Sequence, residues 1–186
     1  MSAVVRDALS SPAISQGSRR WLTVVALASA GIFAAAICRN YASPRPLLVW
    51  NASASAPVGL YIRGDESAVS LGDLVLVEPP RNLARFADKR HYLPLGVSLI
   101  KRVMALSGST ICGAGDTVRI DGRVFLKRRR LDGQLLPLPS WSGCHRLGSG
   151  EVFLAMENVP GSFDGRYFGP LPVTTIKGRL VPLWTR

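Results

Sequence analysis

Residues 98–106 read SLIKRVMAL, and this long run predicts a β-strand. Alternation along a strand places on one face Leu99, Lys101, Val103 and Ala105. Lys101 is the one lysine of four whose strand neighbours are apolar. Burial disfavours the ammonium form, and lowering the pKa of a lysine from about 10.4 to about 7 takes roughly 4–5 kcal/mol. A chain retains such a lysine mainly for chemistry, unless the amine reaches water along its stem.

Turn residues on both sides of this run predict a mainly β domain. Asp121-Gly122, between residues 118–120 and 123–125, is the strongest hairpin signal in the chain. The other expected elements are strands at 47–50, 74–78, 151–156 and 176–183 and one short helix at 81–90. Residues 131–150 are rich in Pro, Gly and Ser and are expected to form a loop or insertion. Eighteen glycines and thirteen prolines fit a β-rich fold with many turns.

The N-terminal part is expected to be a membrane anchor. Residues 21–38 (WLTVVALASAGIFAAAIC) carry no charge, and a helix of this length spans about 27 Å, close to the roughly 30 Å hydrocarbon core of a bilayer. Three arginines precede this run and two follow it, which slightly favours a cytoplasmic segment at 1–20. The alternative is a cleavable signal peptide that ends at the small residues 34–36. A linker at 39–46 and a β-rich domain at 47–186 would follow the anchor.

The charge and the cysteines limit the partners. A net charge of +11 suggests an anionic partner, either nucleic acid or a lipid surface. The basic run 127–130 (KRRR) has no interleaved aromatic residues, and no nucleic-acid-binding motif occurs, so we expect the lipid surface and no nucleic acid. The sequence has no Cys-x-x-Cys and no Cys/His cluster, so no metal or cofactor is expected. Cys112 and Cys144 either pair, which requires an oxidising compartment, or remain buried free thiols.

Residues 51–61 (NASASAPVGLY) contain the candidate nucleophile. Ser53 and Ser55 lie two apart, and Pro57 stiffens the backbone that follows them. A rigid stretch suits a nucleophilic serine, although an ordinary Ser-rich turn has the same composition. The two histidines, His91 and His145, lie in a polar run and a loop-rich region, so neither is the expected base. Lys101 is the better candidate.

Residues 162–170 (SFDGRYFGP) contain a third candidate group. Ser162, Asp164 and Arg166 alternate, so on an extended segment all three would point the same way. They would then form a hydrogen-bonded charged cluster. A surface turn with one Asp–Arg ion pair is the alternative.

Taken in order, these segments resemble the type I signal peptidases, a family with a Ser/Lys dyad. The spacing S-x-P-x-G-x-Y after Ser55 is closest to the TraF-type conjugative transfer signal peptidases. The resemblance implies a β-rich catalytic domain outside the cytoplasm, on a single-pass anchor in the cytoplasmic membrane. It assigns Ser55 as nucleophile, Lys101 as general base and Ser53 as an oxyanion donor. The supporting residues implied are Ser162, which orients the lysine, and the pair Asp164 and Arg166.

Two positions depart from the family pattern. Residues 107–109 read SGS where the family usually approaches PGD, and Gly165 stands where a serine is usual. The implied reaction is acyl transfer that removes leader peptides from exported precursors, with pilin maturation as the expected role. Water, or the amine terminus of the pilin, would resolve the acyl-enzyme. A membrane-anchored β-rich scaffold of a secretion apparatus that only binds is the alternative. For an enzyme outside the cytoplasm, we expect Cys112 and Cys144 to be paired.

Overall fold

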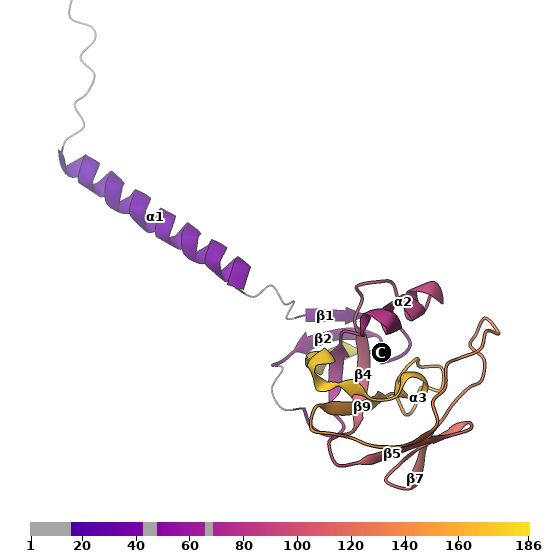
Figure 1. Cartoon of the computed structure of the whole chain (residues 1–186). Helices are drawn as coiled ribbons and strands as arrows, with labels where there is room; N and C mark the ends of the chain where they lie inside the picture. The colour runs from indigo at the N-terminus through magenta and orange to yellow at the C-terminus, as the bar shows by residue number, and fades with distance from the viewer. Residues whose placement is uncertain (1–15, 43–47, 66–68) are drawn as a thin grey trace, which may run out of the picture. The chain divides into compact units, whose positions relative to one another are not determined.

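The computed structural model describes residues 16–42, 48–65 and 69–186 (Figure 1). It divides the chain into two compact units, residues 1–45 and residues 46–186. Residues 1–15 of the expected cytoplasmic segment, and residues 43–46 of the expected linker, lie outside the described part.

The first unit contains helix α1 (Gln16–Ala42). The helix extends beyond the expected segment 21–38 at both ends and includes the first four residues of the expected linker. Its described side chains are exposed, among them Trp21, Leu27 and Phe33. Within the described ranges, no helix combines the length and the apolarity that a membrane crossing requires.

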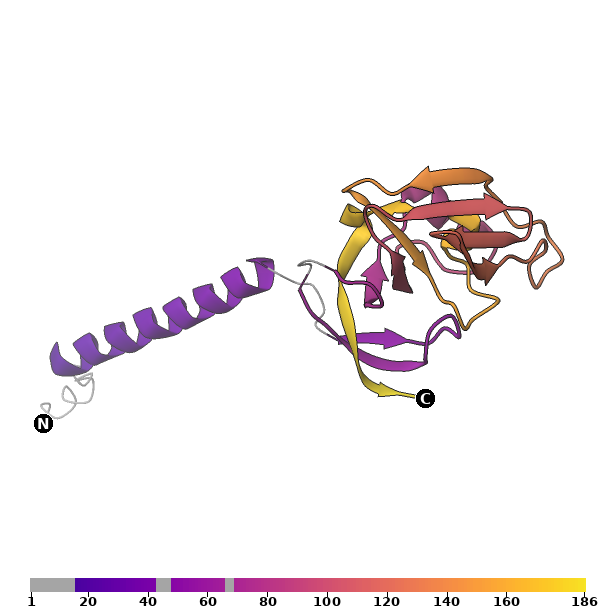
Figure 2. The same cartoon turned by 90° about the horizontal axis from the view of Figure 1, so that it is seen from below.

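The second unit is built on two antiparallel sheets. The larger sheet has seven strands in the order β1-β2-β11-β3-β4-β9-β10. Their bounds are β1 (Leu48–Asn51), β2 (Gly59–Arg63), β3 (Leu74–Val77), β4 (Leu99–Ala105), β9 (Glu151–Ala155), β10 (Leu171–Pro172) and β11 (Ile176–Thr185). The first part of β11 pairs with β3 and the second part with β2, so this long strand joins β1 and β2 to the rest of the sheet (Figure 2).

The smaller sheet has four strands in the order β7-β6-β5-β8. Their bounds are β5 (Thr110–Ala114), β6 (Thr117–Ile120), β7 (Arg123–Lys127) and β8 (Gly143–Arg146). The predicted hairpin is confirmed, because Ile120 pairs with Arg123 and both turn residues have positive φ, 48° at Asp121 and 80° at Gly122. Such a two-residue turn matches the right-handed twist of its strands.

Residues 131–150, expected to form a loop or insertion, include one strand that was not predicted. Residues 143–146 are strand β8, which pairs with β5 and places Cys144 directly opposite Cys112. The two cysteines form a disulfide, so the expected pairing is present. Gly, Cys, His and Arg make a weak strand signal, and β8 exists because β5 offers it an unpaired edge.

Two helices complete this unit, α2 (Arg81–Lys89) and the short α3 (Gly165–Phe168), with a 3₁₀ turn at Val173–Thr175. The helix expected at 81–90 is therefore confirmed, and its Ala87 packs against Phe163 and Tyr167.

Strand β4 lies in the middle of the core. Six of its seven residues are buried, and only Arg102 is exposed. The pairing with β9 shifts register between Val103 and Ala105, so Met104 and Ala105 join the same buried cluster instead of opposite faces as expected. Lys101, the third residue of β4, is among the buried ones, with a relative exposure of 1%.

Candidate active site

Ser55 lies on the loop between β1 and β2, and Asn51 organises this loop. Asn51 is the last residue of β1 and is only 6% exposed. Its amide nitrogen donates to the carbonyl oxygens of Ser53, Ala56 and Pro57, each at 3.0 Å. Its side-chain oxygen accepts from the backbone N–H of Ser53 at 3.0 Å. One buried amide therefore holds the loop that presents Ser55, and sequence reasoning missed it; an Asn at the end of an apolar run was the available signal.

The loop is closed by the strand that follows. Gly59 is the first residue of β2, with φ 154°. A side chain at Gly59 would collide with the carbonyl oxygen of Trp184 on β11, so only glycine fits. The hydroxyl of Tyr61 donates to the carbonyl oxygen of Pro57 at 2.5 Å. Both contacts restrict the position of the loop relative to the sheet.

The two serine hydroxyls of the loop form a short chain of hydrogen bonds. Ser53 Oγ donates to Asn51 Oδ1 at 3.0 Å, and Ser53 Oγ and Ser55 Oγ are 2.8 Å apart. A carboxamide oxygen only accepts, so the single proton of Ser53 is directed to Asn51. The Ser55 hydroxyl consequently donates to Ser53 in this arrangement.

Lys101 is 1% exposed at the centre of β4. Its amine donates to Ser162 Oγ at 2.9 Å. Burial lowers the pKa of Lys101 to about 8, while Asp164 acts to raise it and Arg166 to lower it further. A lysine with a pKa of about 8 is about one-tenth neutral at pH 7, and this neutral form can accept a proton.

Asp164 and Arg166 form a buried ion pair, with Arg166 Nη2 2.7 Å from Asp164 Oδ2 and Arg166 Nε 2.8 Å from Asp164 Oδ1. The guanidinium also donates to the carbonyl oxygens of Met156 and Val159. The expectation of an extended segment is wrong here, because Asp164 is the N-cap of α3 and Arg166 lies inside that helix. The cluster forms nevertheless, since the turn folds Arg166 back onto its own cap.

Steric crowding explains why position 165 is a glycine. A Cβ atom at this position would lie 2.7 Å from the carbonyl oxygen of Leu154 and 2.7 Å from the ring of Phe153. The Phe153 ring fills the space that a side chain at position 165 would need. The serine that is usual in the family at this position is therefore replaced by glycine where the large Phe153 of β9 occupies the space.

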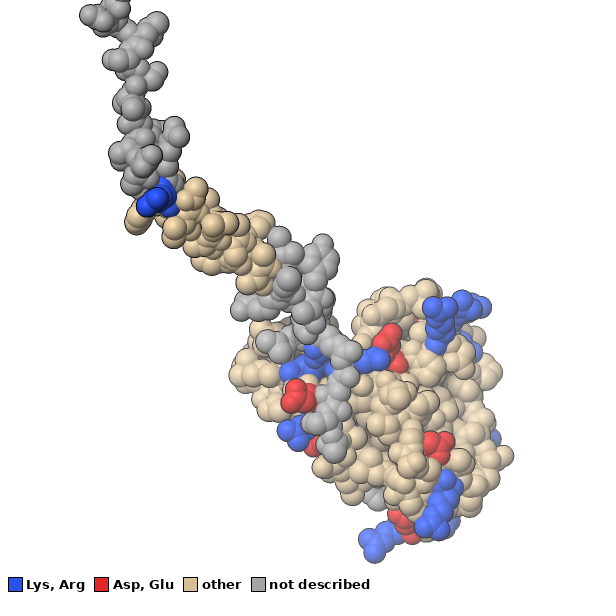
Figure 3. Space-filling model, turned by 60° about the vertical axis from the view of Figure 1, so that its left-hand side comes forward, with Lys and Arg blue, Asp and Glu red and all other residues tan. Residues whose placement is uncertain are grey.

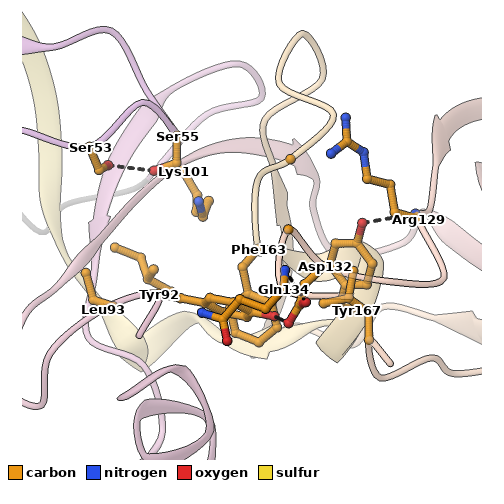
Figure 4. A pocket seen from close by; sticks show the side chains of 14 residues that line it. Ser53, Ser55, Tyr92, Leu93, Lys101, Arg129, Asp132, Gln134, Phe163 and Tyr167 are labelled. Atoms are coloured by element: carbon orange, nitrogen blue, oxygen red, sulfur yellow. Dashed lines mark hydrogen bonds between the residues drawn. The ribbon is translucent and has the colours of Figure 1, made fainter. Parts of the chain in front are cut away.

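A pocket of about 400 Å³ connects these groups (Figure 4). Ser53, Ser55 and Lys101 line one side of it. The remaining lining residues are mostly aromatic or apolar, or come from the segment between β7 and β8: Tyr92, Leu93, Leu99, Phe163 and Tyr167, and Arg129, Asp132, Gly133, Gln134 and Leu138, with Gly161.

The structure brings Ser55 and Lys101 to the same pocket without a hydrogen bond between them. Among the described residues, the partner of the Ser55 hydroxyl is Ser53 and that of the Lys101 amine is Ser162. The histidines lie elsewhere: His145 on β8 pairs with Glu151, and His91 is exposed after α2. In the part of the chain that the structure describes, no group of three or more His, Cys, Asp or Glu side chains could hold a metal ion.

The pocket wall formed by residues 129–138 was not predicted from the sequence. Asp132 fixes it: its Oδ2 accepts from the hydroxyl of Tyr92 and from Arg90 Nη1, the latter at 2.8 Å. Its Oδ1 accepts the backbone N–H groups of Gln134 and Leu136. These hydrogen bonds lower the pKa of Asp132 to about 2, that from Tyr92 most strongly. Arg90 and Tyr92 lie 42 and 40 positions from Asp132, so no local pattern indicated these two partners.

A mainly β domain with a buried lysine and a serine-bearing loop at one pocket defines a signal-peptidase-like protein. Residues 18–184 match the signal peptidase family, peptidase S26. The chain therefore belongs to this family.

Several proteins resemble the chain. Plasmid transfer protein TraF of Escherichia coli is 35% identical over 146 residues, which are 73% of this chain and 81% of that protein. The probable conjugal transfer protein TraF of Sinorhizobium fredii is 36% identical over 139 residues, 69% of this chain and 72% of that protein. A crystal structure of a signal peptidase I from Enterococcus faecalis is 20% identical, with a TM-score of 0.38 over 62% of this chain and 98% of that one.

Proposed function

We propose that this protein is a membrane-anchored serine endopeptidase that uses Ser55 and Lys101 to remove leader peptides from exported precursors, with a pilin precursor of a conjugative transfer apparatus as its substrate. The proposal depends mainly on the environment of the Lys101 amine. This amine is almost fully buried, its pKa is lowered to about 8, and it lines the same pocket as Ser55. A binding scaffold has no use for so costly a group.

The reaction would begin with a proton transfer. Neutral Lys101 takes the proton of Ser55 as the serine oxygen attacks the scissile carbonyl carbon. The resulting ammonium then protonates the leaving amine as the C–N bond breaks, which leaves an acyl ester on Ser55. The ester holds the fragment that lies N-terminal to the cut, and the other fragment leaves as the free amine. Water, activated by the neutral amine of Lys101, hydrolyses this ester; attack by the N-terminal amine of the bound fragment itself would release that fragment as a ring instead.

The resting hydrogen bonds must change for this to happen. Ser55 has to turn its proton from Ser53 towards Lys101, and Ser53 has to turn its own from Asn51 towards the substrate carbonyl oxygen. A single rotation about each C–O bond redirects a proton, and hydroxyl rotation is fast. Ser53 would then act as an oxyanion donor, a contribution that is typically worth about 3–4 kcal/mol.

The other residues would support the lysine. Ser162 holds the amine by an uncharged hydrogen bond, so it positions Lys101 without stabilising the ammonium as a carboxylate would. Asp164 and Arg166 are paired with each other, and their opposite effects on the pKa of Lys101 partly cancel. The dominant influence on the lysine is then burial.

We place α1 in the cytoplasmic membrane, with residues 47–186 on the extracytoplasmic side. An uncharged stretch of 18 residues at 21–38 and the exposure of its described apolar side chains support this. The disulfide between Cys112 and Cys144 favours an oxidising compartment for the β-rich unit. The alternative is that residues 34–36 are cleaved and the domain is released. Sodium carbonate extraction of cell membranes, followed by N-terminal sequencing of the recovered protein, separates the two.

The role in pilin maturation rests on the likeness to plasmid and conjugal transfer proteins. The test is incubation of the full-length protein with a candidate prepilin, followed by intact mass and N-terminal sequence of the product. Hydrolysis adds one water across the two fragments, whereas cyclisation leaves the fragment N-terminal to the cut lighter by one water than its linear form. Ser55→Ala and Lys101→Arg should abolish both, the latter because a guanidinium stays protonated. Cleavage that persists in Lys101→Arg contradicts the proposed mechanism.

A further inference from the structure

The four basic residues 127–130 do not form one basic face. Arg128 is 8% exposed, and its guanidinium lies 4.6 Å over the ring of Trp141. Arg130 points to the surface and pairs with Asp116 at 3.1 Å. On the face of the molecule drawn in Figure 3, Lys and Arg side chains likewise form separate groups, some of them beside acidic residues. Arg129 has a different environment from its neighbours, because it lines the pocket that contains Ser55 and Lys101.

The backbone of Arg129 forms a hydrogen bond, whereas its guanidinium forms none with the described residues. Its backbone N–H donates to the hydroxyl of Tyr167 at 3.1 Å, which fixes the base of the side chain at the pocket wall. No described residue forms an ion pair with its guanidinium or accepts a hydrogen bond from it. Figure 4 shows the guanidinium across the pocket from Ser55 and Lys101.

The carboxylate in the pocket cannot neutralise Arg129. Asp132 already accepts four hydrogen bonds, from Arg90, Tyr92 and the N–H groups of Gln134 and Leu136. Its negative charge is balanced by the ion pair with Arg90. The pocket therefore has a positive charge at its wall that lacks a counter-charge from the described part of the chain.

We propose that Arg129 is a specificity-determining residue that binds a carboxylate of the peptide close to the scissile bond. This rests on the proposed peptidase function and adds a substrate class to it. A guanidinium presents paired N–H donors that match a carboxylate, and Arg129 is exposed, so a bound peptide can reach it. The carboxylate has two possible sources, an acidic side chain or the C-terminus of a substrate cut near its end.

Binding is tested apart from cleavage with the full-length Ser55→Ala variant. The probes are fluorescein-labelled ten-residue Ala-rich peptides with Glu, Gln or Lys at each position in turn, each made with a free or an amidated C-terminus. We expect one carboxylate position to bind about tenfold tighter than its neutral counterpart, the size of one charge-assisted hydrogen bond. Adding Arg129→Gln should remove this difference, and Arg129→Glu should reverse it in favour of Lys. Arg130→Gln, on the paired neighbour, should keep it.

Cleavage of the same peptides by the protein with Ser55 intact gives the second readout, as kcat/KM. If Glu is preferred over Gln at one position, the carboxylate comes from a side chain; if a free terminus is preferred over an amide, it comes from the C-terminus. Equal affinity for charged and neutral peptides, or a preference that survives Arg129→Gln, overturns the proposal even when cleavage proceeds. If charged peptides bind more tightly than neutral ones only when Arg129 is present, and no peptide is cleaved, the carboxylate site is supported and the proposed peptidase function is refuted.

Discussion

The amine of Lys101 donates a hydrogen bond to the hydroxyl of Ser162 at 2.9 Å, although the two residues are 61 positions apart. Lys101 lies on β4, and Ser162 follows β9, the strand that pairs with β4. The backbone N–H of Ser162 donates to the carbonyl oxygen of Val159 at 3.0 Å, so the turn that carries the serine is itself fixed. The amine of Lys101 thus meets an uncharged partner on a turn that a backbone hydrogen bond fixes.

Removing the Ser162 hydroxyl should lower kcat strongly and the free energy of unfolding only slightly. In Ser162→Ala, the amine loses its fixed position, and a misplacement of about 1 Å is enough to reduce a rate about a hundredfold. We expect kcat to fall about 10–100-fold, with a small change in KM and a loss of about 1–2 kcal/mol in the free energy of unfolding. Steady-state kinetics beside urea unfolding measures both. Ser149→Ala, at an exposed turn, is the matched control, and an unchanged kcat in Ser162→Ala would show that the hydroxyl does not orient the base.

The pKa of Lys101 predicts how activity depends on pH. In the proposed mechanism the neutral amine is the active form, so kcat/KM should rise with pH and level off above about 8, the folded-state pKa. The histidines should not contribute, and His91→Ala and His145→Ala should retain the same profile. The neutral fraction of an amine with a pKa of about 8 rises about ninetyfold between pH 6 and 9. A profile that is flat across this window would contradict the assignment of Lys101 as base.

The same pKa predicts how stability depends on pH. The folded-state pKa, about 8, lies below the ordinary lysine value of 10.5. Between these values the unfolded chain binds more protons, so the free energy of unfolding rises with pH across this window. Below pH 8 the buried ammonium lowers the free energy of unfolding by its full amount, on the order of 3 kcal/mol.

Lys101→Met should therefore be inactive and yet more stable than the unmodified protein near pH 7, with the advantage shrinking as the pH approaches 10. Urea unfolding at two pH values measures this, and the exposed Lys127→Met is the control for loss of one charge. Strong destabilisation of Lys101→Met at both pH values would mean that the lysine is a structural cation.

Asn51 should matter for catalysis although it carries no reactive group. Asn51→Asp keeps the shape of the side chain but replaces the amide that donates to Ser53, Ala56 and Pro57 by a buried carboxylate. We expect kcat to fall about a hundredfold because the loop moves Ser55, and the free energy of unfolding to fall by about 1–3 kcal/mol. Asn82→Asp, on the exposed surface of α2, should change neither. Wild-type kcat in Asn51→Asp would assign the loop geometry to Pro57 instead.

The disulfide should stabilise the β-rich unit. Cys112 and Cys144 are separated by 32 positions, and closing such a loop is worth about 3.5 kcal/mol in the chain-entropy model. Non-reducing peptide mapping of the native protein should recover the linked peptides. A reducing agent should lower the unfolding midpoint of the native protein and leave that of Cys112→Ala/Cys144→Ala unchanged. Two alkylatable thiols in the native protein would contradict the pairing and the compartment inferred from it.

Gly165→Ser restores the residue usual in the family, and it should destabilise this chain. The added Cβ would meet the ring of Phe153 and the carbonyl oxygen of Leu154, and overpacking of this kind costs about 1–3 kcal/mol. Gly150→Ser, where a Cβ meets nothing within 4 Å, is the control. Phe153→Leu should recover part of the loss in the double variant, measured by a double-mutant cycle. Additive effects would mean that the Phe153 ring is not the obstacle.

The sequence by itself determined the elements whose signals are local. The hairpin at Asp121-Gly122, helix α2 and strand β4 lie where the pattern predicted them, because turn conformation and side-chain alternation depend on residues only a few positions away. Apolar neighbours of Lys101 also indicated its burial. The order of the motifs indicated the family.

The tertiary structure decided what depends on distant partners. Strand β8 forms only because β5 offers it an edge, and the bulge in β4 follows from its pairing with β9. Gly165 is explained by a ring on another strand. The free guanidinium of Arg129 could not be distinguished from its basic neighbours in the sequence, since their partners lie in other segments. Hydrogen bonds and close packing join residues that folding brings together, and a one-dimensional pattern does not contain those distances.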